Sequence, residues 1–238
     1  MIFIYNAYVL FFVATLPVIL IGLFVYLKDK EKEPKKIIAR MFFGGMVAAI
    51  ITILLTLLYE KNIFTFDYDG NDNMLNIIIH TFIEVALIEE FSKWIITYLF
   101  SYNDKEFDEL YDMIVYSVFV ALGFAWIENL LYIFGEGSFL TAVIRLFVSV
   151  PIHASLGIFM GYFLSLSKLD IIYKSNKHYK KNIFRSILIP ILLHGIYDFC
   201  LYTRDYYVLF LLLIFVVFIH VIAYKKIKLL SGVKLSLK

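Results

Sequence analysis

The chain has 238 residues, of which 62% are hydrophobic, with a formal net charge of +2 and a mean hydropathy of +0.83. A soluble globular domain is closer to half apolar, so this composition excludes an ordinary soluble protein and indicates an integral membrane protein. The small net charge gives no reason to expect a nucleic-acid partner. The single cysteine, Cys200, excludes an internal disulfide and a metal site built from several cysteines.

Seven apolar runs are long enough to cross a bilayer as helices. They cover roughly residues 2–27, 37–59, 75–100, 113–134, 139–166, 183–201 and 206–224. We therefore predict an all-α fold, a polytopic bundle of about seven transmembrane helices, in one integral membrane domain over residues 1–238. Spans three to six, within residues 75–201, carry the ionisable groups described below, whereas the spans within 1–60 and 206–224 are peripheral.

Lysine and arginine are unevenly distributed between the segments that connect these runs. Residues 28–36, 167–182 and 225–228 are basic, whereas the segments after the second, fourth and sixth runs are acidic or nearly uncharged. Because positively charged loops tend to stay in the cytoplasm, this pattern predicts an N-terminus outside the cell and a cytoplasmic C-terminus.

The third run contains Glu89, Glu90 and Lys93. A charged side chain near the middle of a bilayer costs about 2.5–3.5 kcal/mol on insertion scales, so these groups need partners. Glu89 lies one helical turn from Lys93, and Glu90 lies three residues from it, so both pairs can form. Two carboxylates share one ammonium group, which leaves one of them in need of another cation, a metal or a proton. The alternative is a structural ion pair that holds helices together.

The fourth and fifth runs each bring a further ionisable group. Glu128, followed by Asn129, lies in the outer half of the fourth run, and His153 lies in the middle of the fifth. Gly157 and Gly161 lie on the same stripe as His153, in a GxxxG pattern that lets another helix approach closely. His153 is therefore expected to face a protein interface. Taken singly, each of these polar groups is also explained by hydrogen bonds between helices.

In the sixth run, His194 and Asp198 lie one turn apart on one helix face. The aspartate can fix the tautomer of the histidine or raise its basicity. A structural histidine is again the alternative. Arg145, near the outer end of the fifth run, is expected to extend its head group to the interface. Glu84, in the third run, is expected to face a vestibule or to pair with Arg145.

Four consecutive spans thus each carry an ionisable group, at depths that differ by roughly 12 Å at about 1.5 Å per helical residue. Paired glutamates, two histidines and an aspartate form a ligand and acid–base set of the kind that hydrolytic sites use. A transporter or channel would use the same groups as a proton or cation path, and predicts inverted repeats, which are not visible in the sequence. A third interpretation is a non-catalytic immunity or scaffold protein.

Four motifs, in this order and one per helix, resemble the signature of the PrsW-type intramembrane proteases. They are Glu89-Glu90-x-x-Lys93, Phe124-x-x-x-Glu128-Asn129, His153-x-x-x-Gly157 and His194-x-x-x-Asp198. This family is related more distantly to the CAAX prenyl endopeptidases and abortive-infection membrane proteases. In that group the second motif usually ends in His and the last in Asn, where this chain has Glu128 and Asp198. The match covers about residues 84–200.

The resemblance implies a polytopic bacterial membrane protease, an endopeptidase that cuts other membrane proteins. The best-known member makes the first cut in a single-pass anti-sigma factor. A single-pass membrane protein is therefore the expected substrate, and the bacterial cytoplasmic membrane, with its lipid bilayer, is the expected location. The acidic outer loop over residues 60–73 is a candidate for contact with that substrate.

The resemblance also implies that the paired glutamates and the histidines are catalytic. We expect a water molecule activated by Glu89 or Glu90 as general base, with the other glutamate held by Lys93. Because Lys93 leans toward the face of Glu89, we predict that Glu89 is the paired carboxylate and Glu90 the base.

The expected metal ligands are Glu128, His153 and His194, which would hold a zinc ion and leave an open position for water. Without a metal, the two histidines would act as acid and oxyanion donor. Asp198 orients His194 in both versions, and no organic cofactor is expected.

Overall fold

The computed structural model describes residues 2–63, 66, 73–136, 145, 147–174, 176–203 and 205–235. The helices in these residues are α1 (Ile2–Lys28), α2 (Lys35–Asn62), α3 (Met74–Ile78), the π-helix η1 (Ile79–Leu87), α4 (Ile88–Ser101), α5 (Asp112–Glu136), α7 (Ser149–Ile172), α8 (Asn176–Tyr202) and α9 (Tyr206–Leu230). The described residues form no sheet, and their only β contact is an isolated bridge between Glu109 and Lys234. The predicted all-α fold is confirmed.

Six of these helices, α1, α2, α5, α7, α8 and α9, are long and apolar enough to cross a membrane. The third expected span is built differently, because α3, η1 and α4 follow one another without a break. The junction residues Ile79 and Ile88 both keep right-handed helical dihedrals. The chain from Met74 to Ser101 is therefore one continuous rod with a π-helical middle, a feature that often marks functional sites.

The fifth and seventh spans differ from the predicted limits. Helix α7 begins at Ser149 instead of residue 139, because Val148 leaves the helical region with φ −120°. Pro151 then lies in the first turn, where its missing N–H costs no helical hydrogen bond. Arg145 therefore precedes the helix of His153 and is not part of it. Helix α9 continues to Leu230, so the basic residues 225–228 are helical.

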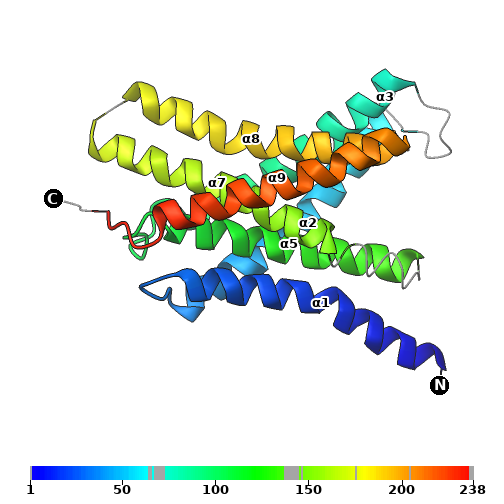
Figure 1. Ribbon diagram of the computed structural model, residues 1–238, viewed down its shortest axis with the longest axis horizontal. Helices are drawn as coiled ribbons and strands as arrows, with labels where there is room; N and C mark the ends of the chain where they lie inside the picture. Colours follow the sequence, from blue (N-terminus) through cyan, green and yellow to red (C-terminus); the bar gives the residue numbers. More distant parts are fainter. Residues whose placement is uncertain are drawn as a thin grey trace.

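Helices α5 and α7 form the centre of the bundle, with α2 packed against α5 and α8 packed against α7. Figure 1 shows the helices running along the long axis, with α1 at one edge and α8 at the opposite one. In the most apolar stretch of α7, 83% of the residues are buried, compared with 17% in α9. Helix α9 thus presents most of its apolar surface outward, as expected of a peripheral, lipid-facing helix.

The close approach of α7 to another helix is confirmed at the GxxxG pattern. A Cβ atom on Gly161 would lie 2.3 Å from Ser117 Oγ and 2.4 Å from the Met113 carbonyl oxygen of α5. At Gly157 the nearest atom of α5 would lie 3.0 Å away. This contact fixes the position of His153, which lies one turn before Gly157 and is buried.

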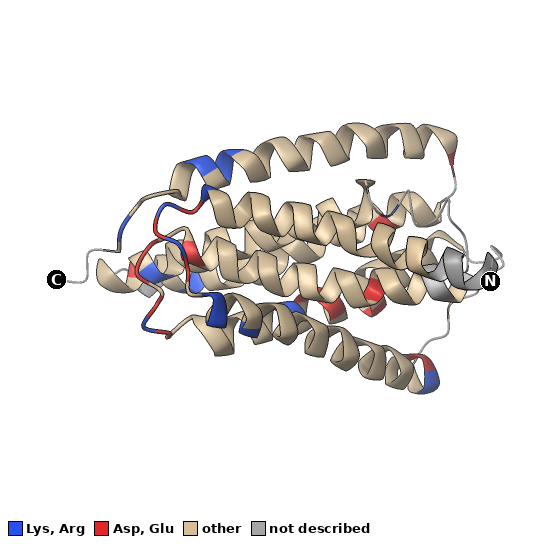
Figure 2. Ribbon diagram, turned by 90° about the horizontal axis from the view of Figure 1, so that it is seen from below, with Lys and Arg blue, Asp and Glu red and all other residues tan. Residues whose placement is uncertain are grey.

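Lysine and arginine gather toward one end of the bundle, the end where the C-terminal segment lies (Figure 2). Three segments meet there: the α1–α2 loop, the segment between α4 and α5, and residues 233–235. The Tyr111 hydroxyl donates to the Val25 carbonyl, and the backbone N–H groups of Leu110 and Leu235 join the last two segments. The predicted orientation of the chain in the membrane stays a prediction. Most of the acidic segment 60–73 lies outside the described residues.

Candidate active site

The two glutamates and the lysine of α4 form one buried cluster. Lys93 Nζ lies 2.7 Å from Glu90 Oε1 and 3.2 Å from Glu89 Oε2. The lysine also lies 3.9 Å above the ring centre of Phe124, which is a favourable cation–π position. The expected sharing of one ammonium group by two carboxylates is present in the structure.

His153 of α7 connects this cluster to α5. Its Nδ1 lies 3.0 Å from Lys93 Nζ, and its Nε2 lies 2.8 Å from Glu128 Oε2. An ammonium group can only donate, so we assign His153 the tautomer that accepts at Nδ1 and donates from Nε2 to Glu128. The expectation that His153 faces protein is confirmed, because the residue is 3% exposed.

His194 of α8 approaches from the opposite side with a similar arrangement. Its Nδ1 lies 2.9 Å from Glu90 Oε1, and its Nε2 lies 3.2 Å from Asp198 Oδ2, one turn along the same helix. The rings of His153 and His194 are 5.3 Å apart and nearly perpendicular. Both histidines therefore point Nδ1 toward the α4 cluster and Nε2 toward an outer carboxylate, Glu128 or Asp198.

Arg145 completes the surroundings of Glu128. Its guanidinium lies 2.8 Å from Glu128 Oε1, and its Nε–H donates to Asn129 Oδ1 at 3.0 Å. It also lies 3.9 Å above the ring of Tyr132. The prediction that Arg145 extends to the interface is therefore wrong, because the partly buried carboxylate of Glu128 attracts it inward. Glu84 does not pair with it and instead contacts His80 Nδ1 at 3.0 Å.

Four of these side chains have donor atoms close enough to share a metal ion. One atom each of Glu89, Glu90, His153 and His194 lies within 4.8 Å of the others. Glu90 Oε2 is buried and has no hydrogen-bond partner, so a strong acceptor is left over where a cation would fit. Carboxylate and imidazole donors suit zinc and similar divalent ions. Glu128 is not in this group of four.

A cavity of about 600 Å³ opens onto the cluster from between α2, η1, α5 and α8. Glu89 lines this cavity, whereas Glu90 and Lys93 do not. Glu89 is 8% exposed and Glu90 is fully buried. The prediction that Glu89 would be the more tightly paired carboxylate is reversed, because His194 reaches Glu90 from α8 and Lys93 lies closer to it.

The π-helix carries two further polar residues to the same cavity, His80 and Glu84. Glu84 and Glu89 are five residues apart, about 140° around an ordinary α-helix. A π-helix bonds residue i to i+5 and so reduces that angle, which explains how both can line one cavity. Glu60 of α2 lies at the same wall.

Sequence reasoning identified the paired glutamates, Glu128, both histidines and Asp198, and the structure brings them together. It missed the role of Arg145, although a single arginine within an apolar run was a signal that a buried carboxylate lay nearby. It did not predict the His80–Glu84 pair either, because nothing in the sequence indicates a π-helix.

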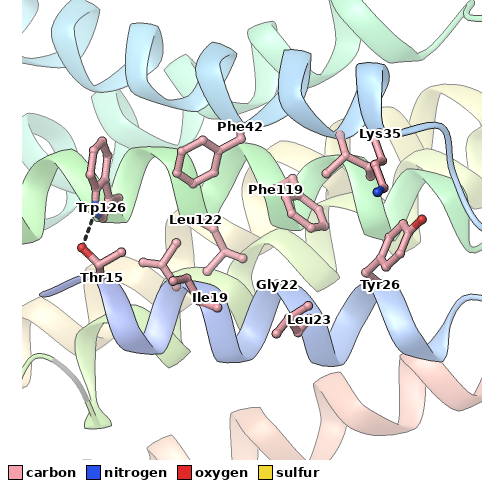
Figure 3. A pocket seen from close by; sticks show the side chains of 12 residues that line it. Thr15, Ile19, Gly22, Leu23, Tyr26, Lys35, Phe42, Phe119, Leu122 and Trp126 are labelled. Atoms are coloured by element: carbon pink, nitrogen blue, oxygen red, sulfur yellow. Dashed lines mark hydrogen bonds between the residues drawn. The ribbon is translucent and has the colours of Figure 1, made fainter. Parts of the chain in front are cut away.

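A second cavity, of about 450 Å³, lies between α1, α2 and α5. Figure 3 shows mainly aromatic and aliphatic side chains around it, including Phe42, Phe119 and Leu122. At one end of this cavity, Trp126 Nε1 donates a hydrogen bond of 3.0 Å to Thr15 Oγ1. No carboxylate or histidine lines it, so the polar cavity is the better candidate for an active site.

Comparison with known proteins identifies the family of this chain. Residues 33–224 match the model of the PrsW family intramembrane metalloproteases. The chain is 38% identical to Protease PrsW of Oceanobacillus iheyensis, over 86% of this chain and 88% of that protein. It is 36% identical to Protease PrsW of Clostridioides difficile, over 87% of this chain and 85% of that protein. It is 33% identical to Protease PrsW of Bacillus subtilis, over 79% of this chain and 81% of that protein.

No solved structure matches the chain. The family match covers most of the chain, and each of these three relatives exceeds 30% identity over more than two thirds of its own length. The chain therefore belongs to the PrsW family of intramembrane metalloproteases and is a multi-pass bacterial membrane endopeptidase.

Proposed function

We propose that this protein hydrolyses a peptide bond in single-pass membrane proteins of the anti-sigma-factor type, at a zinc site held by Glu90, His153 and His194. One observation carries the proposal. Each histidine turns its Nε2 to an outer carboxylate and its Nδ1 toward the α4 cluster, where His194 contacts Glu90 and His153 contacts Lys93. Metal-binding histidines commonly donate their second N–H to a carboxylate, which fixes the tautomer and the ring orientation.

In this assignment Glu128 and Asp198 orient the ligands and do not bind the metal. Arg145 holds Glu128 from the other side, so that carboxylate already has two partners. Three protein ligands leave an open position, and a bound zinc ion supplies Lewis-acid chemistry that polarises a carbonyl and favours deprotonation of water. Lys93 contacts His153 Nδ1 in this structure, so we infer that it gives up this contact when the metal binds.

Glu89 is the general base in this proposal. It is the carboxylate of the α4 pair that lines the cavity, and so the one that a water molecule beside a substrate can reach. Glu89 takes a proton from that water as the oxygen bonds to the carbonyl carbon. It returns the proton to the nitrogen as the C–N bond breaks, which gives a carboxylic acid and an amine. Lys93, 3.2 Å away, holds Glu89 in place.

The walls of the cavity support a membrane-protein substrate. Leu57 of α2, Leu131 of α5 and Leu201 of α8 line it together with the polar groups. Such a surface can receive the apolar side chains of a transmembrane segment while its backbone meets the polar floor. A helical substrate must unwind at the cut, because its carbonyls are otherwise hydrogen-bonded within the helix. Arg145, Tyr132 and Tyr197 supply donors for the freed carbonyls.

The ligand set can be tested by metal analysis of purified variants, combined with cleavage of a single-pass anti-sigma factor in proteoliposomes. Glu90→Gln and His194→Ala are expected to lose both bound zinc and cleavage. Glu128→Gln is expected to retain some zinc, because it would remove only a positioning group. Glu84→Gln, in the same cavity, is the matched control and should keep its zinc.

If Glu90→Gln kept its full zinc content and Glu128→Gln lost its zinc, Glu128 and not Glu90 would be the ligand, and this assignment would be overturned. Cleavage that persists in zinc-free protein with a chelator present would overturn the metal site itself. A soluble protein carrying the same cleavage sequence tests the substrate class, and it should not be cut.

A further inference from the structure

A second group of buried carboxylates lies at the basic end of the bundle, away from the active site. Asp29 and Glu33 belong to the α1–α2 loop, and Asp112 is the first residue of α5. One oxygen of each lies within 4.8 Å of the others, and all three residues are buried. Nothing in the proteolytic mechanism uses them.

In two of these carboxylates, only one of the two oxygens accepts a hydrogen bond from the protein. The Glu33 N–H donates to Asp29 Oδ2 at 3.2 Å, and the N–H groups of Asp108 and Glu109 donate to Asp112 Oδ2 at 3.0 and 2.7 Å. Asp29 Oδ1 and Asp112 Oδ1 are buried and have no hydrogen-bond partner. A buried carboxylate oxygen without a partner is costly, so each such atom indicates a missing ligand or proton.

The nearby cations do not fill this role. Lys32 Nζ donates to the backbone carbonyls of Leu27 and Asp29, and Lys234 pairs with Glu31. Within the described ranges, no lysine or arginine forms an ion pair with Asp29, Glu33 or Asp112. Among the side chains that the structure describes, the carboxylates thus have a hydroxyl donor, since Tyr116 donates to Glu33 Oε2, but no ion-paired cation.

We propose that Asp29, Glu33 and Asp112 bind a hard divalent cation of the Mg²⁺ or Ca²⁺ kind, which fastens the α1–α2 loop to the start of α5. The donor atoms are all oxygens, which these ions prefer, and no imidazole or thiol takes part. Ligand distances of about 2.0–2.6 Å place opposing oxygens roughly 4–5 Å apart, in agreement with the 4.8 Å limit of this group. This site would be structural and independent of the catalytic metal.

The test is thermal unfolding of the full-length, metal-stripped protein in detergent micelles at pH 7.5. Ca²⁺ or Mg²⁺ is added to the samples, and the blank contains Na⁺ at the same ionic strength. The wild-type Tm should rise by about 5–10 °C at a hundredfold excess over the Kd. Asp29→Asn and Asp112→Asn should each lose most of this rise. Glu31→Gln, an exposed change in the same loop, is the matched control and should keep it.

Two results would overturn the proposal. One is an equal rise in Asp112→Asn, which would locate the cation elsewhere. The other is no response to either cation in the wild type.

Discussion

The two buried groups of carboxylates in this bundle differ in how they obtain positive charge. In the middle of the bundle, four carboxylates meet a lysine, an arginine and two histidines that come from α4, α7, α8 and the segment before α7. At the basic end, the carboxylates of Asp29, Glu33 and Asp112 form no ion pair with a lysine or arginine, as far as the described residues show. The difference follows from the surroundings. Deep in a membrane most counter-charges have to come from the protein itself, whereas near the interface ions and protons are readily supplied by the solution.

The comparison also separates two uses of buried charge. In the middle group, both ring nitrogens of each histidine have a charged partner: Glu90 and Asp198 for His194, and Lys93 and Glu128 for His153. These contacts fix the orientation of the rings, which suits catalysis. In the end group, the carboxylates join a loop to a helix, which suits a structural tie.

The largest effect is expected for Glu89→Gln. Loss of a general base typically lowers the rate by a factor of about 10²–10⁴. The amide keeps the size of the side chain, so the fold and the bound metal should be retained. Cleavage rates in proteoliposomes and metal content measured on the same preparation check this. A variant that cleaves normally would show that Glu89 is not the base.

Removing Arg145, the arginine partner of Glu128, should leave this carboxylate without an ion-paired lysine or arginine, as in the group at the basic end. Arg145→Met is expected to lower the free energy of unfolding by about 3 kcal/mol, since it leaves the partly buried carboxylate of Glu128 with one partner fewer. The double variant Arg145→Met, Glu128→Leu should recover part of this loss, because no unpaired charge remains. Unfolding in detergent micelles measures both. An equally unstable double variant would mean that Arg145 acts through packing and not through charge.

The positions of the catalytic groups depend on close helix packing. Gly161→Ala is expected to cost about 2 kcal/mol, because its Cβ would lie 2.3 Å from Ser117 Oγ and 2.4 Å from a carbonyl oxygen of α5. Gly22→Ala is the control, since its Cβ would lie 3.4 Å from the Phe119 ring, an ordinary contact. Thermal unfolding of the two variants compares them. Equal stability would show that α5 and α7 can separate without cost.

The smallest effect is expected for an exposed pair at the basic end. Burial raises the pKa of Asp104, but the Arg40 guanidinium outweighs it, so the pKa lies below its ordinary value. The carboxylate therefore contributes stability above its unfolded pKa and loses it as the pH falls through the folded pKa. Arg40→Ala should cost at most about 1 kcal/mol at pH 7. It should cost almost nothing at a pH below the lowered folded pKa of Asp104, where that carboxylate is protonated. Unfolding at the two pH values measures this, and a loss that is independent of pH would contradict it.

Much of the site was predictable because its residues are costly where they lie. Glu89, Glu90, Glu128, His153 and His194 lie within apolar runs, so each had to have a partner, and the regular helix spacing predicted the pairs with Lys93 and with Asp198. Contacts between helices were not predictable in the same way, because residues distant in sequence meet only after the helices have packed.

The amino-acid sequence by itself determined the all-α fold, the approximate spans and the four motifs, because hydropathy and local periodicity are properties of short segments. Tertiary structure decided the rest. It turned Glu89 to the cavity and enclosed Glu90, it brought Arg145 to Glu128, and it gathered Asp29, Glu33 and Asp112 from a loop and a distant helix. The physical reason is that these outcomes depend on which helix faces another and at what rotation. Packing of the whole bundle, including close contacts at residues such as Gly161, sets both.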